Sequence, residues 1–533
     1  MAGNLSVAER LDRLAPDQRA AATARAGPVL CLAPAGSGKT TTLVARIAWL
    51  IDGGTDPATI TAITFNRRAA GELAGRLAGA LEPLGLAPDA IRVRTFHALG
   101  LEILRDAVGA TVAIADRAGL VAGLFPDLDD AELAELDTAI SRLKVEHGVS
   151  ADDVESDPDP GPIAVRFAAY ERALEDRGAL DFDDLVLGAL RVLRSNAELL
   201  ARWRRRCAAL LVDEIQDVDR AQLELGLTLA APANQVFLVG DDDQSIYGWR
   251  LADVRRIFSL AARLPGLERH ALVANYRCPR PVVERSMRLI EVNRERFAKS
   301  VRAEAEGRGR LILAPDAGTD HERVGRVLDS WPADAASRAV IARTNLELVP
   351  AAAAAVERRI AFNAAGLDLP LEAPGLDAAL AAIESAELAA PGVPLLVLIS
   401  RLRAEGDERM AIACDLLVGW APRFSSPAAL RSAVEATRRV LAGLRTEAAQ
   451  LTLATAHAVK GLEFDHVVVL MDADRFPSRR ALDDAREPQR ALEEERRLAY
   501  VAWTRAKRSL TLLYDPAAPS RFLLEAFDRR ELG

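Results

Sequence analysis

The 533-residue chain is too long for one ordinary core, and half of its residues are hydrophobic, so we expect more than one globular domain. The net charge of −9 argues weakly against a nucleic-acid-binding protein, although binding depends on the local field of a groove rather than on the total charge. The four scattered cysteines form no C-x-x-C pair, which indicates a reduced, cytoplasmic protein without a disulfide framework or a zinc site. The N-terminus lacks the apolar core of a signal peptide, and no apolar run is long enough to predict a membrane span.

Short apolar runs alternate with helical patterns in the first part of the chain. We predict strands at 28–32, 59–65, 91–94, 208–212 and 235–240. Such alternation predicts an α/β fold, a parallel sheet with helices on both faces. Ligand sites in these sheets lie at the carboxyl ends of the strands, and the motifs described below begin at such ends.

The alternating pattern is interrupted twice. Between about 105 and 180 the chain is helical in period, with a loop at 156–162. Strand patterns return at 337–344, 451–457, 465–471 and 509–514, and an Ala-rich helical stretch at 386–448 divides them. We therefore expect two α/β domains, each with a mainly helical insertion.

The stretch APAGSGKT at 33–40 has the sequence of a phosphate-binding loop with alanine at the first glycine position. Gly36 and Gly38 let backbone N–H groups approach phosphate oxygens, and the following helix presents its positive end. Lys39 is predicted to reach the β- and γ-phosphates, and Thr40 to bind Mg²⁺. The alternative is a glycine-rich turn, which the preceding strand and the GKT ending disfavour. The predicted nucleotide-binding residues of this loop are Ala35, Gly36, Ser37, Gly38, Lys39, Thr40 and Thr41.

The strand at 208–212 ends in Asp213 and Glu214. Asp213 is predicted to hold Mg²⁺, and Glu214 to orient or deprotonate the attacking water. An adjacent Asp-Glu pair is usually a solvated turn, but after a buried strand in a chain with a GKT loop it is more specific. The guanine-reading N-K-x-D motif is missing, which favours ATP over GTP. Phosphoryl transfer also needs cations, for which Arg277 and Arg505 are candidates.

The motifs resemble, in order, those of the UvrD/Rep-like superfamily 1 (SF1A) DNA helicases. Besides the phosphate loop, the matching segments are LAPDQ, ITFNRRAA, RTFHALG, LDFDDL, LLVDEIQD, GDDDQSIYGWR, ANYRCP, ATAHAVKGLEFDHVVV and EERRLAYVAWTRAK. The resemblance implies two RecA-like P-loop NTPase lobes that use ATP and Mg²⁺. It places lobe 1A at 1–104 and 181–278, insertion 1B at 105–180, lobe 2A at 279–385 and 449–533, and a reduced insertion 2B at 386–448.

The same resemblance implies how the nucleotide is bound. Gln18 would read adenine, Tyr276 would stack on its ring, and Glu463 would support the site. Gln244 would sense the γ-phosphate, and the two candidate arginines would act as arginine fingers from the second lobe.

The resemblance also implies a DNA track in GDDDQSIYGWR. Tyr247 and Trp249 would stack on bases without reading sequence, and the competing interpretation for these aromatics is core packing. Further candidates along the track are Phe65, Phe96, His97, Arg250 and His457. Of the three carboxylates, Asp241 best fits the Mg²⁺ shell, and Asp242 and Asp243 are expected only to cap or solvate the turn.

The family resemblance implies an ATP-dependent helicase that moves 3′ to 5′ on single-stranded DNA, in repair, replication or recombination. The short 2B region leaves open a DNA-dependent ATPase subunit or DNA-end sensor that works with a partner nuclease, including in phage defence. A third alternative, an inactive DNA-binding scaffold, is disfavoured by the intact catalytic set. The expected partners are single-stranded DNA, single/double-strand junctions and a nuclease or repair protein, with no membrane.

Overall fold

The computed structural model describes residues 6–109, 111–304, 309–373, 375–406 and 408–532, which form two compact units. The first unit comprises Met1–Arg277 and Asn293–Ala305, and the second comprises Cys278–Val292 and Glu306–Gly533. The structure groups Arg277, which was expected to act from the second lobe, with the first unit, where its N–H donates to Oδ1 of Asn275 at 2.9 Å. It also groups 293–304, which the sequence places in the second lobe, with the first unit. The physical reason is a set of ion pairs and a strand pairing, described below, that no local pattern reveals.

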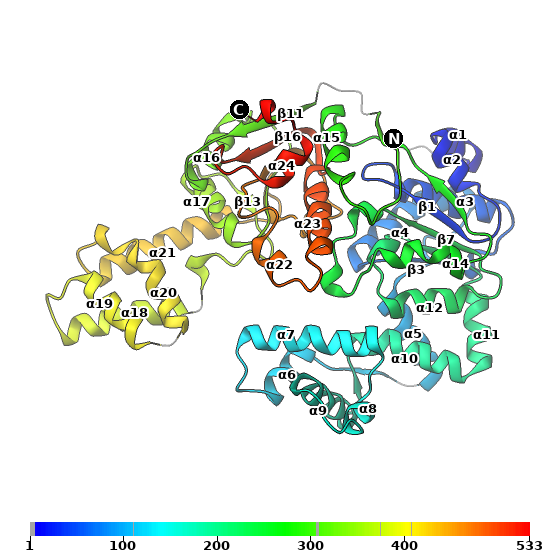
Figure 1. The fold of residues 1–533 in the computed structure, drawn as a ribbon, viewed down its shortest axis with the longest axis horizontal. Helices are drawn as coiled ribbons and strands as arrows, with labels where there is room; N and C mark the ends of the chain where they lie inside the picture. The colour runs from blue at the N-terminus through cyan, green and yellow to red at the C-terminus, as the bar shows by residue number, and fades with distance from the viewer. Residues whose placement is uncertain (1–5, 110, 305–308, 374, 407, 533) are drawn as a thin grey trace. The chain divides into compact units, whose positions relative to one another are not determined.

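The first unit contains a six-stranded parallel sheet in the order β3-β2-β6-β7-β1-β8 (Figure 1). Its strands are β1 Val29–Leu32, β2 Ile60–Thr64, β3 Arg92–Thr95, β6 Ala209–Val212, β7 Val236–Gly240 and β8 Glu268–Ala271. The five predicted strands are present. The sixth, β8, was missed because it is an edge strand that is largely exposed and lacks an apolar pattern.

Both faces of this sheet are buried, as expected for parallel strands. Leu30 and Leu32 of β1 enter one core cluster, and Val29 and Cys31 enter the other, as the two-residue period of a strand requires. The covering helices are α1 Val7–Asp12, α2 Pro16–Ala22, α3 Lys39–Asp52, α4 Arg67–Leu81, α5 Phe96–Val108, α10 Phe182–Ser195, α11 Ala197–Arg206, α12 Arg220–Ala230, α13 Arg255–Phe258 and α14 Leu260–Arg263.

The first insertion is helical, as predicted (Figure 1). It has its own small core of buried side chains. It comprises β4 Ala113–Ile114, α6 Arg117–Leu124, α7 Asp130–Ser141, a π-helix at Arg142–His147, α8 Ala151–Glu155, α9 Pro162–Asp176 and β5 Ala179–Leu180. The buried Lys144 joins it to the start of α10, since its Nζ lies 3.0 Å from Asp181 and 2.9 Å from Asp184.

The second unit contains another six-stranded parallel sheet, in the order β11-β16-β15-β12-β14-β13. Its strands are β11 Arg310–Pro315, β12 Arg338–Ala342, β13 Phe362–Asn363, β14 Leu451–Thr455, β15 Phe464–Leu470 and β16 Ala506–Tyr514. The helices of this α/β part are α15 Arg280–Ile290, α16 Asp320–Ser330, α17 Val349–Glu357, α22 Arg479–Asp483, α23 Pro488–Trp503 and α24 Arg521–Ala526. The four predicted strands are present, and the two that were missed, β11 and β13, are the edges of the sheet.

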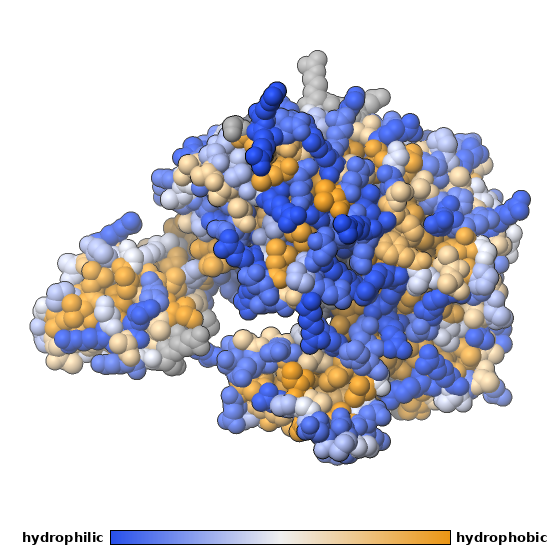
Figure 2. All heavy atoms as spheres, viewed as in Figure 1, coloured by the Kyte–Doolittle hydropathy of each residue, from blue (hydrophilic) through white to orange (hydrophobic). Residues whose placement is uncertain are grey.

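The second insertion is a helical subdomain with its own core. It comprises α18 Gly375–Ala389, α19 Leu395–Glu405, α20 Glu408–Val418 and α21 Pro427–Leu444. The helices therefore begin at 375 rather than at 386, because Leu376 and Leu380 of α18 already pack in this core. Figure 2 shows apolar surface on these helices, which expose Leu388 and Ile412. In the described part of the chain no helix combines the length and the apolar character needed to cross a bilayer.

The packing of α5 on α10 generates a prediction about Gly100. A Cβ atom at this position would lie 2.3 Å from the carbonyl oxygen of Leu185, so Gly100→Ala must push the two helices apart. We expect a loss of about 1–3 kcal/mol in the free energy of unfolding. Gly75→Ala in α4 is the control, because its Cβ would enter open space and helix propensity predicts a gain of about 0.5–1 kcal/mol. Urea unfolding followed by circular dichroism measures both, and equal effects would contradict the close approach.

Candidate functional site

Two glycines shape the phosphate loop between β1 and α3. Gly36 and Gly38 have φ angles of 69° and 83°, in the left-handed region, and Gly38 caps the N-terminus of α3. A Cβ on Gly36 would lie 2.7 Å from Cβ of Arg277, and a Cβ on Gly38 would lie 2.5 Å from Nε2 of Gln18. Glycine is therefore needed at both positions for conformation and for space.

The segment after β9 (Ala274–Asn275) supports this loop from its side. Nδ2 of Asn275 donates to the carbonyl oxygen of Ala35 at 2.8 Å, and the N–H of Tyr276 donates to that of Gly36 at 2.9 Å. The Tyr276 side chain is 46% exposed, in keeping with a stacking surface beside the loop. Asn275 was not among the predicted residues, although it precedes the predicted Tyr276.

Gln18 is buried against the phosphate loop. Its Nε2 donates to the carbonyl oxygen of Ser37 at 2.8 Å, and its Oε1 accepts from the N–H of Ala15 at 3.2 Å. Both ends of the amide therefore have protein partners, and in this conformation Gln18 braces the loop. Its role in reading adenine stays a prediction.

An ion pair joins the loop to the end of β6. Nζ of Lys39 lies 2.8 Å from Oε2 of Glu214. Burial favours loss of the lysine proton, but the carboxylates of Glu214, Asp241 and Asp213 outweigh it and raise the pKa of Lys39. Burial, followed by the neighbouring Glu214 carboxylate, raises the pKa of Asp213 to about 7. A carboxylate that is costly to ionise alone is well suited to sharing its charge with a cation.

The backbone of Glu214 is strained, and Gln216 fixes its side chain. Glu214 has a φ angle of 53°, which a residue with a side chain rarely adopts outside functional sites. Nε2 of Gln216 donates to Oε2 of Glu214 at 2.5 Å, and its Oε1 accepts from the N–H of Asp241 at 2.9 Å. A Cβ on Gly240 would lie 2.3 Å from Oε1 of Gln216, so glycine is required beside it. Gln216 was not among the predicted residues, although it lies within the matching segment LLVDEIQD, two residues after Glu214.

The connection continues to Gln244, which is buried and donates from Nε2 to Oδ2 of Asp241 at 2.7 Å. Lys39, Glu214, Gln216, Asp241 and Gln244 thus form a continuous set of bonds, hereafter the polar chain. It runs from the phosphate loop to the loop after β7 within the first unit.

The expectation about Asp242 and Asp243 is wrong. Both are buried and ion-paired, with Asp242 2.6 Å from Nζ of Lys299 and Asp243 2.8 Å from the Arg296 guanidinium, so they do not merely solvate the turn. Asp241 pairs with Nζ of Lys299 at 2.7 Å and accepts from Gln244, so both of its oxygens have protein partners. Its place near an Mg²⁺ shell stays a prediction.

The same loop presents aromatic rings on its other side. The ring of Tyr247 stacks on that of Phe65, with centroids 4.9 Å apart and planes 13° apart, and meets the edge of Trp249 at 6.3 Å. The Arg250 guanidinium lies 5.3 Å from the Trp249 ring centroid. Trp249 is 60% exposed, so core packing does not explain it. We call Phe65, Tyr247 and Trp249 the aromatic row, and it lies where β2 and β7 end.

Phe96 is a correction, since it is only 4% exposed and belongs to the main core cluster, so it packs instead of facing a ligand. The neighbouring His97 is half-buried and meets the edge of Phe182 at 5.9 Å. Burial, and then the charge of Arg250, lower the pKa of His97 against the opposing effect of Asp183. Phe182 is 54% exposed and was missed, although LDFDDL marks it as an apolar residue at the start of a helix.

The predicted residues of the second unit differ in burial. Arg505 is buried, and its guanidinium donates to the carbonyl oxygens of Val501 at 2.9 Å and Leu462 at 3.2 Å. Glu463 is exposed, with Oε1 3.7 Å from Nζ of Lys507. Their roles at the nucleotide stay predictions.

His457 follows β14 and is half-buried. Burial, with the charges of Arg343 and Lys460, lowers its pKa to about 4. The imidazole is therefore neutral at pH 7, and any contact with nucleic acid would be stacking or hydrogen bonding rather than an ion pair.

The loop fits a magnesium–nucleotide group. Oγ of Ser37 is buried and has no hydrogen-bond partner among the described residues, and the left-handed glycines open a cradle beside it. Thr40 in the first turn of α3 and Asp213 after β6 supply one hydroxyl and one carboxylate. Mg²⁺ in nucleotide sites commonly takes one or two protein ligands and completes its shell with phosphates and water.

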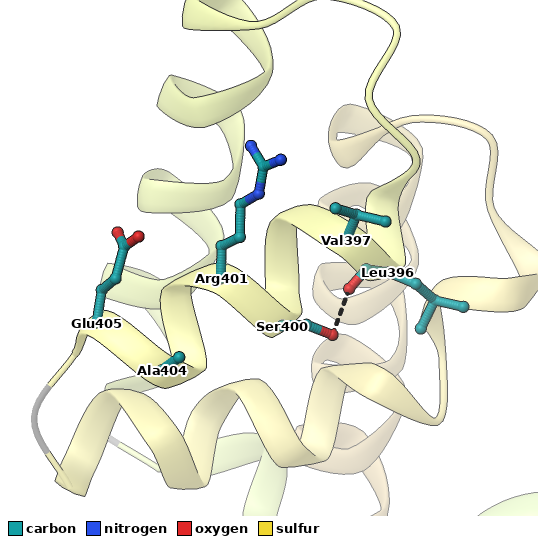
Figure 3. A pocket seen from close by; sticks show the side chains of 6 residues that line it. All are labelled: Leu396, Val397, Ser400, Arg401, Ala404 and Glu405. Carbon is teal, nitrogen blue, oxygen red and sulfur yellow. Dashed lines mark hydrogen bonds between the residues drawn. The ribbon is translucent and has the colours of Figure 1, made fainter.

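The surface also has hollows apart from these residues. One lies on α19, lined by Leu396, Val397, Ser400, Arg401, Ala404 and Glu405 (Figure 3). Within it, the Ser400 hydroxyl donates to the carbonyl oxygen of Leu396 at 2.7 Å, while the Arg401 and Glu405 side chains project away from the helix. It contains none of the predicted site residues.

A parallel sheet with a phosphate loop after β1 and an Asp-Glu pair after a nearby strand defines a P-loop NTPase. Residues 14–265 match the UvrD/REP helicase N-terminal domain, and residues 435–516 match the UvrD-like helicase C-terminal domain. The chain belongs to the UvrD/Rep-like helicase family.

Curated relatives agree with this assignment. The ATP-dependent DNA helicase PcrA of Staphylococcus aureus (strain Mu50) is 32% identical over 55% of this chain, and that of Leuconostoc citreum is 32% identical over 57%. These matches span only 42% of each PcrA protein. The probable DNA helicase II homolog of Rickettsia conorii is 25% identical over 97% of this chain and 96% of its own length.

The burial of the two aromatic residues predicts opposite effects on stability. Phe96→Ala should leave a core cavity and cost about 3–5 kcal/mol of unfolding free energy. Trp249→Ala should change it by no more than about 0.5 kcal/mol, since most of the ring is in solvent. Thermal and urea unfolding of the two variants check this, and a large loss for Trp249→Ala would mean that the ring packs.

Proposed function

We propose that this chain is an ATP-dependent DNA helicase that moves along single-stranded DNA. The main observation behind this proposal concerns the loop from Asp241 to Arg250. This one loop contains Gln244, the last residue of the polar chain, and also Tyr247 and Trp249 of the aromatic row. Gln244 donates to Asp241, which belongs to the set of bonds that reaches the phosphate loop. The exposed Trp249 ring lies five residues later in the same loop. The names of the relatives support the same activity.

At the nucleotide, the chain's own groups divide the work. Lys39 and the N–H groups at the start of α3 would bind the phosphates, and Thr40 and Asp213 would hold Mg²⁺, which neutralises phosphate charge when bound. Glu214 would orient the attacking water and accept its proton. By the family resemblance we propose Arg277 and Arg505 as the cations that stabilise the charge developing on the γ-phosphate.

Coupling to DNA follows from the shape of the loop. The amide of Gln244 would exchange its bond with Asp241 for one with the γ-phosphate, and the short path to Tyr247 and Trp249 would carry the shift to the rings. Aromatic rings bind bases of any sequence by stacking, which suits a motor that must step along arbitrary DNA. Phe65, His97, Phe182 and His457 are proposed to extend this track.

A second candidate is a DNA-dependent ATPase subunit that unwinds weakly alone and works with a partner nuclease. The helical insertion of α18 to α21, with exposed Leu388 and Ile412, favours it, because the family resemblance implies a longer insertion in fully active helicases. We also propose a reducing, cytoplasmic compartment, in which the four buried cysteines would remain thiols.

Two substitutions should separate catalysis from DNA binding. We expect Lys39→Ala to abolish ATP turnover while single-strand binding survives. Trp249→Ala should weaken single-strand binding by about 1–3 kcal/mol and reduce DNA stimulation, while turnover without DNA is retained. ATPase assays with and without a homopolymeric oligonucleotide, and fluorescence anisotropy for binding, measure both. The absence of DNA stimulation in the wild type would refute the proposed function.

Tailed duplexes should decide direction and autonomy. The family resemblance predicts displacement of duplexes with a 3′ tail and not of those with a 5′ tail. Strand displacement by the protein alone, followed by native gel electrophoresis, checks this. DNA-stimulated ATP hydrolysis without displacement of either duplex would favour the subunit that needs a partner.

A further inference from the structure

The carboxylates of the Gln244 loop meet a segment that arrives from elsewhere in the chain. Nζ of Lys299 lies 2.7 Å from Asp241, 2.6 Å from Asp242 and 2.8 Å from Asp243. The Lys299 side chain is only 2% exposed, so one buried ammonium touches all three acids. We call residues 293–304, which contain Lys299, the returning segment.

A second set of contacts holds the returning segment in the same place. The Arg296 guanidinium makes a bidentate ion pair with Asp243, in which Nε donates to Oδ1 at 2.9 Å and Nη2 donates to Oδ2 at 2.8 Å. The N–H of Phe297 donates to Oδ2 of Asp242 at 2.8 Å, and the Phe297 ring meets the edge of Phe258 at 4.8 Å. The position of Lys299 is therefore fixed by its neighbours, and is not one choice among many for a flexible side chain.

The charges explain why the contact is needed. Three buried carboxylates next to one another repel strongly, and the cations Lys299 and Arg296 lie against them. Burial, and the charges of Asp243 and Asp241, raise the pKa of Asp242 despite the opposing effect of Lys299. Without the ammonium, Asp241 could not remain a fixed acceptor for the Gln244 amide.

The far end of the returning segment reaches the phosphate loop by another path. Its strand β10 (Arg302–Ala303) pairs in parallel with β9, and the N–H of Glu304 donates to the carbonyl oxygen of Asn275 at 2.8 Å. Asn275 is the residue whose amide holds Ala35. One short segment is thus attached both to the Gln244 loop and to the support of the phosphate loop.

The chain enters the returning segment from α15, which belongs to the second unit. Within that unit α15 packs against α23 and α24, and α23 ends at Trp503, two residues before Arg505. Sγ of Cys278, just ahead of α15, donates to the carbonyl oxygen of Thr504 at 3.4 Å. The returning segment is therefore the covalent extension of the helix that supports the Arg505 region.

We propose that Lys299 is a positioning residue that fastens the Gln244 loop to the returning segment and so passes movement of Gln244 to α15. The proposal rests on the proposed function, because it requires Gln244 to respond to the nucleotide. Lys299 touches no substrate in this scheme and acts through Asp241, Asp242 and Asp243. It makes the loop-to-segment connection rigid enough to transmit a shift of the size of one hydrogen bond.

The first test removes the ammonium. Lys299→Met should lower kcat about 10- to 100-fold, the range seen when a group that supports a site residue is lost, with the KM for ATP changed less than about threefold. Arg302→Gln is the matched control, since it removes one positive charge from the same segment but from an exposed side chain, and it should behave like the wild type. Lys299→Met/Asp242→Asn restores the charge balance and guards against misfolding. It should melt like the wild type yet keep the kcat defect.

The second test reads the connection directly. Amide hydrogen exchange of the full chain, with Mg²⁺ and a non-hydrolysable ATP analogue, should protect the phosphate loop and also the 293–304 peptides of the wild type. In Lys299→Met/Asp242→Asn the phosphate loop should still be protected, and the 293–304 peptides should not.

Each outcome decides one claim. If DNA does not stimulate ATP turnover by the wild type, the proposed function is wrong. Normal DNA-stimulated turnover in the wild type, with unchanged exchange at 293–304, would overturn the role of Lys299 alone. Full recovery of turnover in the double variant would show that Lys299 only neutralises charge, and unfolding of both variants would assign it a purely structural role. Either result would also overturn the proposal.

Discussion

The ion pair between Lys39 and Glu214 is the interaction on which the rest of the site depends. It joins the helix after β1 to the end of β6, two strands that are not neighbours, because β7 lies between them. Gly240 at the end of β7 leaves the space through which Gln216 reaches from Glu214 to Asp241. The order of the strands therefore brings these groups together at the carboxyl ends of β1, β6 and β7, although they are far apart in the sequence.

The loop after β7 combines two opposite environments. Its acids and Gln244 point into the protein, where each is paired, while Trp249 stands in solvent beside Arg250. Buried polar groups are held in one geometry because the cost of leaving one unpaired is high. The same loop is thus held by buried polar contacts at one end and exposed to solvent at the other.

Buried charge is used elsewhere in the fold for the same purpose. Lys144 joins the first insertion to the start of α10, and Arg323 in α16 binds Asp472 after β15 in the second unit. Ion pairs of this kind contribute little net stability, since desolvation offsets attraction, but a single unpaired partner is strongly unfavourable. They therefore select one arrangement of segments rather than add stability.

Local patterns in the sequence determined the α/β class, the nine predicted strands, the helical insertions and the phosphate loop with its Asp-Glu pair. These depend on residues close to one another in the chain, so periodicity and motif spacing reveal them. Only the tertiary structure decided the edge strands β8, β11 and β13, the burial of Phe96 against the exposure of Trp249, and the bonds of Gln216. It alone placed Lys299 against acids more than fifty residues earlier in the chain. An exposed edge strand has no apolar alternation that a sequence pattern could reveal. The residues next to a lysine in the sequence do not indicate that its partner is a distant carboxylate. The chain has to fold before such pairs exist.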